Sequence, residues 1–297
     1  MSLKQALLVV NRKSRSGQTD LSAGLDLLKD RGLTVKEAVV DQPESIPELI
    51  RQHREKVDRI IVAGGDGTLN AAAEAMIEIG LPLGILPIGT ANDLARTLGI
   101  PTELPEACAV IAEGYTHAID VGWVNGVYYF NVAHIGLGVQ VTHQLSAEVK
   151  ARWGILGYLH GIFKAFQENR AFRAHITFDN RHRRTKSIEI AIGNGRHYGG
   201  GMTIAEEATI YDHQLYLYSL KPLSLWKLIT LAPALRSGRY AGQDGVELLK
   251  AQEITIRTRK PMSIDTDGEL RTHTPAHFRV IPAALSVYVT EPYANHA

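Results

Sequence analysis

A glycine-rich turn at residues 64–68, Gly-Gly-Asp-Gly-Thr, constrains this chain more than any other feature. The apolar run 60–63 precedes the turn, and an alanine-rich stretch at residues 69–79 follows it. A strand, a glycine turn and a helix N-terminus together form an anion site. Glycine lets backbone N–H groups approach phosphate oxygens, and the first helical turn adds its positive dipole end.

A carboxylate in the middle of this turn, Asp66, indicates that the phosphate is bound together with a metal. A bare carboxylate would repel phosphate, and a divalent cation between the two removes that conflict. Mg²⁺ is the usual partner of carboxylates and nucleotide phosphates. The turn lacks the Gly-Lys-Ser/Thr that ends a Walker loop, so it predicts a different kind of Mg-nucleotide site.

Size and composition limit the class of protein. The 297 residues suffice for one large core or two ordinary ones, and a chain that is 45% hydrophobic and 21% charged is globular. A net charge of +1 argues against a general nucleic-acid binder. The single cysteine, Cys108, lies in an apolar helix-like stretch, which indicates a packed core residue in a reducing compartment.

No secretory signal is visible, and no apolar stretch reaches membrane-spanning length without charges. We therefore expect a cytoplasmic protein that makes at most transient contact with the inner face of a membrane.

The first part of the chain alternates strands and helices. Strands are expected at 6–10, 35–40, 60–63 and 83–87, and helices at 21–31, 47–56, 69–79 and 91–98. This rhythm predicts a parallel sheet covered by helices, which we assign to a domain of residues 1–122. Ligands of such sheets lie at the C-terminal strand ends, where Asn11 and the turns 64–68 and 89–93 fall.

The pattern changes to period two after about residue 119. Strands are expected at 127–132, 174–178, 187–192, 215–220, 254–258 and 277–281, with turns at 179–180 and 267–268. Helices are expected at 147–166 and 224–236. These segments predict a mostly antiparallel second domain, residues 123–283. The last strand, 284–290, fits either domain, and we assign residues 284–297 to the first.

A second glycine-polar turn, Gly-Thr-Ala-Asn-Asp at 89–93, follows the fourth strand. Thr90 and Asn92 could bind phosphate or ribose, and Asp93 could bind metal; all three are also good helix caps. Two such turns at neighbouring strand ends favour a shared nucleotide site. Ser14, in the polar loop after Asn11, could cover phosphates or belong to an ordinary solvated loop.

The second part holds an acidic turn, Asp-Thr-Asp-Gly-Glu at 265–269. Three carboxylates so close repel one another, so the turn is either exposed or has a metal or catalytic role, and spacing alone favours exposure. Asp120, near the domain junction, could anchor the loop of Asp93, hold a water or be a buried structural residue.

Three further segments have two interpretations each. The glycine stretch 193–202 could line a cleft between the domains or form a flexible loop. The basic run 181–186, at an expected hairpin tip, could attract anionic lipid, although solubility is the favoured interpretation. The apolar helix at 153–166 could form a lipid pocket, although core packing is the default.

Four motifs together resemble the soluble diacylglycerol kinase catalytic-domain family, in its bacterial lipid kinase form. They are the turns at 64–68 and 89–93, the glycine stretch 193–202, and Asp-Gly-Glu at 267–269. NAD kinases and phosphofructokinases share the first motif, and the combination is more specific. The resemblance implies a three-layer α/β domain of the NAD kinase/diacylglycerol kinase type, a C-terminal antiparallel β-sandwich, and an active site in the cleft between them.

The resemblance also implies roles for individual residues. Asp267 and Glu269 would be the acidic pair at the reaction centre, one acting as base and the other supporting metal or geometry, and Asp66 would help place Mg²⁺. Asp93 and Asp120 would complete an acidic network across the cleft. ATP would be held by residues of the two turns and the first loop: Asn11, Ser14, Gly64, Gly65, Asp66, Gly67, Thr68, Asn70, Thr90 and Asn92.

A structural Mg²⁺ site is implied at residues 209–214, with the Asp212 carboxylate and the carbonyls of Thr209 and Gln214 as ligands. The chain departs from the family pattern here, because the usual Asp-Asp-Gly is Tyr-Asp-His at 211–213. It also has Asn11-Arg12 where the family usually has Asn-Pro.

The sequence therefore predicts an ATP- and Mg-dependent lipid kinase that phosphorylates a hydroxyl of diacylglycerol or a related lipid. Two alternatives stay open: a soluble-substrate kinase of the NAD kinase type and a non-catalytic nucleotide-sensing module. The particular lipid and the formation of a homodimer are not determined by the sequence.

Overall fold

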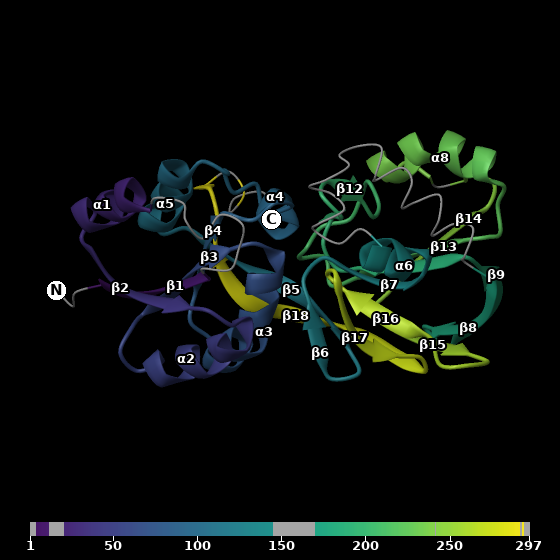
Figure 1. Ribbon diagram of the computed structural model, residues 1–297, viewed down its shortest axis with the longest axis horizontal. Coiled ribbons are helices and arrows are strands. Elements are labelled where there is room, and N and C mark those ends of the chain that lie inside the picture. Colours follow the sequence, from purple (N-terminus) through teal and green to yellow (C-terminus); the bar gives the residue numbers. More distant parts are fainter. Residues whose placement is uncertain (1–3, 12–20, 145–169, 241, 292, 294–297) are drawn as a thin grey trace.

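The computed structural model describes residues 4–11, 21–144, 170–240, 242–291 and 293. Two lobes lie side by side, and one long C-terminal strand, β18 (Ala276–Tyr288), runs through both (Figure 1). The predicted helix 147–166 and Ser14 lie outside the described residues.

The first lobe is a parallel sheet with helices on both faces. Its strands follow the order β2-β1-β3-β4. Their bounds are β1 (Lys4–Asn11), β2 (Leu33–Val40), β3 (Arg59–Gly64) and β4 (Leu83–Pro87). One face carries α1 (Ser22–Asp30) and α5 (Leu104–Glu113), and the other carries α2 (Ile46–His53) and α3 (Asp66–Ile79) (Figure 1). Burial of β3 and β4 along their whole length reflects this double cover. The predicted three-layer α/β fold is confirmed.

Glycine contacts and caps position the helices of this lobe. Helix α3 begins at Asp66, three residues before the expected start, and ends at Gly80 with φ 66°. A Cβ atom on Gly24 of α1 would lie 2.7 Å from Cys108 Sγ of α5, so the two helices approach closely. Cys108 is a packed core residue, as expected, and burial raises the pKa of its thiol to about 11.

The second lobe is a sandwich of two antiparallel layers. One layer has the order β14-β13-β10-β7-β16-β17, and the other is the β18-β15-β8-β9 part of the sheet that begins in the first lobe. Their inward side chains, such as Ile176, Ile190 and Phe278, form one hydrophobic core. The predicted antiparallel β-sandwich is confirmed. The bounds are β7 (Val132–Gly136), β8 (Phe172–Phe178), β9 (Arg181–Ser187), β10 (Glu189–Gly193), β13 (Leu215–Leu220), β14 (Val246–Ala251), β15 (Glu253–Thr258), β16 (Ser263–Thr266) and β17 (Glu269–His273).

The remaining elements complete the described chain. They are a 3-10 turn, η1 (Pro43–Ser45), strands β5 (Thr116–Val124), β6 (Val127–Tyr129), β11 (His197–Tyr198) and β12 (Met202–Thr203), and helices α4 (Asp93–Thr97), α6 (Leu137–Gln144) and α8 (Leu225–Ser237). Helix α8 packs Leu231 onto the outer face of the second sheet, beside Tyr218 and Tyr240. Among the described residues, no helix has both the length and the apolar character needed to cross a membrane.

Strand β18 joins the two lobes. It pairs antiparallel with β15 and β5, and its Val287 pairs parallel with Leu83 of β4. A bulge between Ile281 and Leu285, with Ala283 at φ 48°, interrupts the pairing with β5. It lies between the residues of β18 that pair with β15 and the one that pairs with β4.

Two local expectations were wrong. The expected strand 127–132 is interrupted, and β6 and β7 pair with different neighbours. The basic run 181–186 is strand β9 itself, and the hairpin tip is formed by Asp179 and Asn180 at φ 44° and 60°. Asp and Asn tolerate such left-handed turn positions, while an edge strand accommodates many charged side chains.

Candidate active site

The two glycine turns of the first lobe touch each other. A Cβ atom on Gly89 would lie 2.4 Å from the Gly65 Cα atom, and one on Gly64 would lie 2.5 Å from the Thr68 Cβ atom. Both distances are too short for any side chain. Glycine at 89 therefore lets the two turns meet at the strand ends, and glycine at 64 leaves room for Thr68 within the first turn.

Asp66 links the two glycine turns by hydrogen bonds. Its carboxylate accepts hydrogen bonds from the backbone N–H groups of Asp93 and Leu94, both at 3.1 Å, and from the Asn131 side-chain amide at 3.4 Å. The first two donors belong to the first turn of α4. Asp66 thus organises the second glycine turn and keeps partial exposure at the junction of the lobes.

The other polar side chains of the turns have different surroundings. Asn92, at φ 51°, accepts a hydrogen bond from the Gly89 N–H group and donates to the Pro87 and Gly89 carbonyls. Asn11 donates to the Thr68 hydroxyl at 3.3 Å. These bonds shape the turns from within, whereas Thr90 is exposed and available to a ligand.

Asp93 connects the turns to the second lobe. Its carboxylate accepts hydrogen bonds from the N–H groups of Gly200 and Gly201 at 2.9 to 3.1 Å. These glycines have φ values of 85° and 101°, which explains the need for glycine at these two positions of the stretch 193–202. Burial raises the pKa of the Asp93 carboxyl, the Gly200 N–H group opposes this, and the charge of Asp66 adds to it.

Asp267 is held by donors from both lobes. Its carboxylate accepts hydrogen bonds from the backbone N–H groups of Phe130, Asn131 and Val132 at 2.7 to 3.0 Å. The Asn70 side chain of α3 donates a further bond at 2.9 Å. Asp267 itself sits at φ 48° in the turn between β16 and β17. The acidic turn of the second lobe therefore meets the helix that follows the first glycine turn.

The environment of Asp267 changes its acidity. Its pKa is raised to about 6, because burial and the charge of Asp66 outweigh the opposing effect of the bonds donated by Val132, Asn70 and Phe130. A carboxylate with a pKa near neutrality is ionised at pH 7 and can still accept a proton efficiently, which is what general-base catalysis requires.

Glu269, two residues further, is exposed and lies against the first glycine turn. A Cβ atom on Gly67 would be 3.8 Å from Glu269 Oε1, while Glu269 Oε2 forms an ion pair with Arg271 at 2.9 Å. The third carboxylate, Asp265, is buried and accepts a hydrogen bond from the Gly268 N–H group at 2.9 Å. The three carboxylates of the turn thus have three different environments.

Oxygen atoms suited to Mg²⁺ gather at this junction. Asp66 belongs to the first glycine turn and Glu269 lies against it, and the amide oxygens of Asn70 and Asn131 are buried without a hydrogen-bond donor among the described residues. Mg²⁺ commonly takes one or two carboxylates and completes its shell with phosphate and water oxygens. In the described residues no group of three or more His, Cys, Asp or Glu side chains forms a metal cage. The residues fit a cation that arrives with a nucleotide.

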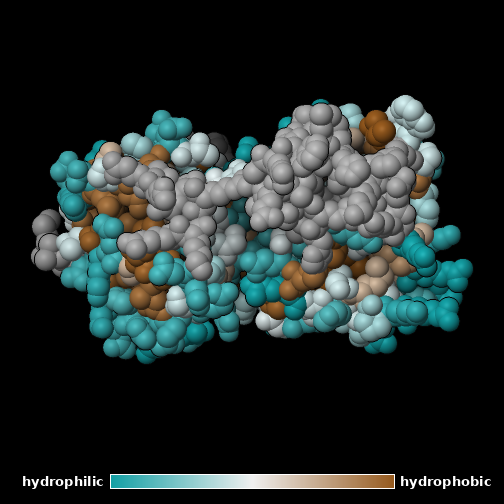
Figure 2. Space-filling model, viewed as in Figure 1, coloured by the Kyte–Doolittle hydropathy of each residue, from teal (hydrophilic) through white to brown (hydrophobic). Residues whose placement is uncertain are grey.

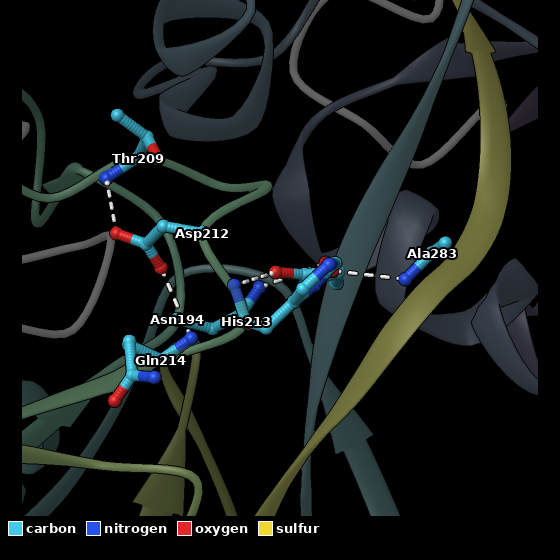
Figure 3. Close-up of polar contacts among 7 residues, drawn as sticks. Asn194, Thr209, Asp212, His213, Gln214 and Ala283 are labelled. Carbon is cyan, nitrogen blue, oxygen red and sulfur yellow. Dashed lines mark hydrogen bonds and ion pairs between the residues drawn. The ribbon is translucent and has the colours of Figure 1, made fainter.

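In the segment 209–214, hydrogen bonds within one turn hold the Asp212 carboxylate. Asp212 accepts hydrogen bonds from the N–H groups of Thr209 at 3.3 Å and Gln214 at 3.0 Å (Figure 3), and from the Tyr216 hydroxyl at 2.8 Å. Both carboxylate oxygens accept bonds from donors of the same turn. The Mg²⁺ site at Asp212 stays a prediction.

Asp120 has a different set of partners. Its carboxylate accepts hydrogen bonds from the backbone N–H groups of His213 at 2.7 Å and Ala283 at 2.9 Å, and its Oδ1 atom lies 2.9 Å from His213 Nδ1 (Figure 3). None of these partners binds the carboxylates of Asp66, Asp93 or Asp267 in the described residues. Asp120 thus holds the bulge of β18 against β5, at the junction of the lobes.

Sequence reasoning missed two features of the junction. Asn131 bridges the site, because its backbone binds Asp267 and its side chain binds Asp66, and no motif marks it. His134 Nδ1 lies 2.6 Å from Glu189 Oε1. Burial alone would lower the pKa of His134, but the bond to Glu189 and the nearby carboxylates of Asp265 and Asp267 raise it overall. Neither feature has a local sequence signal, since each depends on strand pairing.

Two family models match successive parts of the chain. Residues 5–124 match the model of the diacylglycerol kinase catalytic domain. Residues 131–289 match that of the YegS C-terminal NAD kinase beta sandwich-like domain.

Individual relatives cover nearly the whole chain. A probable lipid kinase YegS-like protein of Pectobacterium atrosepticum is 33% identical, over 94% of this chain and 94% of its own length. The probable lipid kinase YegS of Escherichia coli is 31% identical with the same coverage. A crystal structure of a diacylglycerol kinase from Bacillus anthracis superposes with a TM-score of 0.81 at 26% identity, covering 98% of this chain and 99% of that one. The chain therefore belongs to the YegS-like lipid kinase family, with a diacylglycerol kinase catalytic domain followed by the YegS C-terminal domain.

Proposed function

We propose that this protein is an ATP- and Mg-dependent kinase that phosphorylates a hydroxyl of diacylglycerol or a related lipid. The observation that carries the proposal is the position of Asp267. Its carboxylate, with a pKa of about 6, accepts hydrogen bonds both from Asn70, next to the first glycine turn, and from the Phe130 N–H group of the second lobe.

The first lobe would bind the nucleotide. Backbone N–H groups of the turns 64–68 and 89–93 would face its phosphates, and the exposed Thr90 hydroxyl would add a hydrogen bond. Glu269 and Asp66 would hold Mg²⁺, which supplies positive charge to the phosphates when bound.

Asp267 would act as the base. The lipid hydroxyl oxygen would form a bond to the γ-phosphorus while its proton passes to a carboxylate oxygen of Asp267. The bond from that phosphorus to the bridging oxygen of ADP would break, and ADP would leave with the electron pair. Because such transition states are loose, the positions of the two substrates matter more than the strength of the base.

The substrate class rests on the relatives. The Pectobacterium and Escherichia coli relatives are named probable lipid kinases, and the Bacillus anthracis structure is described as a diacylglycerol kinase. The name of the second-lobe family includes NAD kinase, so NAD is the soluble acceptor to compare with lipids.

The test is transfer of labelled phosphate from ATP and Mg²⁺ to detergent-dispersed diacylglycerol, phosphatidylglycerol and a sphingoid base, with NAD as the soluble acceptor. We expect a labelled lipid, and we expect Glu269→Gln to raise the Mg²⁺ concentration needed for half-maximal rate. Glu253→Gln, which changes another exposed glutamate of the sandwich, is the matched control and should leave that concentration unchanged.

Labelled NAD without labelled lipid would refute the proposal in favour of a soluble-substrate kinase. ATP binding without transfer to any acceptor would support a sensing role instead.

A further inference from the structure

The outer face of the sandwich layer β18-β15-β8-β9 is strongly basic. The four strands alternate, and their inward side chains, such as Ile176, Ile256 and Phe278, belong to the sandwich core. Their outward positions carry eight basic residues, all exposed: Arg173, His175, His182, Arg184, Lys186, Arg257, His277 and Arg279. We call these eight residues the basic face.

This concentration is unusual for a chain with 32 basic and 31 acidic residues. Among the outward positions of the four strands in this layer, the one carboxylate is Glu253, which is paired in register with Arg279. Five Lys and Arg side chains thus share the face with a single acidic group. Figure 2 shows hydrophilic residues gathered at the end of the molecule where β8 and β9 lie in Figure 1.

The strand register brings Lys and Arg side chains of neighbouring strands close together. Arg173 is paired with Lys186, and His175 lies between Arg184 on one side and Arg257 on the other. Like charges in directly opposed positions destabilise a sheet. Within the described residues, none of the five Lys and Arg side chains forms an ion pair with a carboxylate. The fold therefore bears a repulsion that an anionic partner would relieve.

Protection of the sheet edge accounts for only part of this pattern. Charged side chains on an edge strand prevent pairing with other molecules, and β9 is the edge strand of the layer. Arg257, however, lies on β15, which has neighbours on both sides, so its charge has no edge to protect. Arg279 on β18 stacks over the Trp123 ring at 4.3 Å. Edge protection therefore does not explain the charge of Arg257 at the centre of the basic face.

We propose that the basic face docks this protein on the anionic surface of a lipid bilayer. Four strands about 4.8 Å apart present a broad sheet surface, and a bilayer with anionic head groups offers an extended negative surface of matching charge. The choice of a bilayer over a nucleic acid rests on the proposed function, because a lipid kinase must reach a substrate that resides in a membrane.

The strength of the attraction follows from the charges. Each Lys or Arg near an anionic bilayer increases binding by roughly fivefold, and the effect decays within a Debye length of about 10 Å at moderate salt. Binding should therefore require anionic lipid and weaken steeply as salt is added.

The experiment measures cosedimentation with vesicles in the absence of ATP, so that it does not depend on catalysis. The variant Arg173→Gln, Arg184→Gln and Arg257→Gln removes three charges from the basic face. The control Arg31→Gln, Arg54→Gln and Lys56→Gln removes three exposed charges from the first lobe. With phosphatidylglycerol-rich vesicles we expect the first variant to bind on the order of 100-fold more weakly than the unmodified protein. The control should bind normally, and pure phosphatidylcholine vesicles should bind none of the three proteins.

Equal binding by the basic-face variant and the control would overturn the proposal. So would a basic-face variant that keeps vesicle binding and loses affinity for RNA or DNA. Helix α8 offers a rival surface, because Trp226 and Ile229 are exposed by 78% and 52%. Loss of binding in Trp226→Ala/Ile229→Ala, with normal binding in the basic-face variant, would also refute the docking proposal.

Activity on detergent-dispersed lipid separates this proposal from the proposed function. If both proposals hold, the basic-face variant phosphorylates dispersed lipid normally and loses activity only on vesicles. Charge-dependent vesicle binding by a protein that phosphorylates no lipid would support the docking surface and refute the kinase.

Discussion

Asp212 and Asp267 are both aspartates in short turns of the second lobe, and the sequence marks both as candidate site residues. All three donors to the Asp212 carboxylate are two to four residues away in the chain. The donors to Asp267 are 135 to 197 residues away, and they come from both lobes.

The comparison separates a carboxylate that shapes its own turn from one that links distant parts of the molecule. Local donors occupy the Asp212 oxygens wherever its turn forms. The three backbone donors to Asp267 come from residues 130–132, and the Asn70 side chain reaches it only when the lobes meet. Burial there raises the pKa of the carboxyl to about 6. A chemical role is therefore expected at Asp267 and a structural one at Asp212.

The sharpest way to break this comparison is to remove each charge in turn. Asp267→Asn should lower kcat by about 10³-fold, because removal of a positioned general base typically costs 10² to 10⁴. Asp212→Asn should change kcat by less than about threefold, since its bonds lie within one turn. Steady-state phosphoryl transfer to the accepted lipid measures both.

Thermal unfolding of both variants serves as the control, because the bond from Asn70 to Asp267 joins the lobes. An Asp267→Asn protein that is folded and fully active would end the assignment of the base. A large loss in Asp212→Asn would return Asp212 to the candidate site.

The pH dependence of kcat/KM sharpens the same contrast. The base acts in its ionised form, so activity should be constant above the Asp267 pKa of about 6. It should fall about tenfold per unit as the pH drops below that value. Asp212→Asn should keep this profile, whereas a profile that is flat down to pH 5 would contradict a base with the raised pKa.

A smaller effect is expected from the link between the lobes at Asn70. Asn70→Ala removes one hydrogen bond to the Asp267 carboxylate and leaves three backbone donors, so kcat should fall about tenfold. Because the Asn70 bond lowers the pKa of Asp267, the acid limb of the pH profile should also move to higher pH.

Asn125→Ala is the matched control for Asn70. The Asn125 amide bonds only within the sandwich, to groups near β17. An acid limb that shifts equally in both variants would show that the loss of any amide near the sandwich shifts the pH profile. That result would disprove the specific role of Asn70.

The smallest effect is expected at Tyr216. Tyr216→Phe removes the hydroxyl that donates to Asp212, and it should lower the free energy of unfolding by about 1 kcal/mol without changing kcat. Urea denaturation measures the first quantity. A changed Mg²⁺ requirement in this variant would mean that the Asp212 turn binds a metal after all.

Much of the fold could be predicted from the sequence, because its signals are local. The period of apolar residues marks β1, β3 and α1 within a few residues, and Gly80 and Gly114 end their helices in the left-handed conformation that glycine favours. The glycine turns could also be predicted, because each is a short continuous motif in the sequence. The break between β6 and β7 was missed because pairing with different neighbours, rather than local propensity, separates the two strands.

The candidate site was only partly predictable. The turn that holds Asp267 and Glu269 stands out by its spacing, whereas Asn131 and the Phe130 amide have no motif and enter the site through the position of β7. The run 181–186 was visible as a charged segment, but Arg257 and Arg279 join it only through strand register.

The sequence by itself therefore determined the α/β and antiparallel halves, the glycine turns and the set of candidate carboxylates. Backbone preference and periodicity depend on near neighbours in the chain. The tertiary structure decided which carboxylate is enclosed, which is satisfied by its own turn and which cations share a face. These properties depend on burial and on the register of strands that are distant in sequence, and no short segment of the chain encodes either.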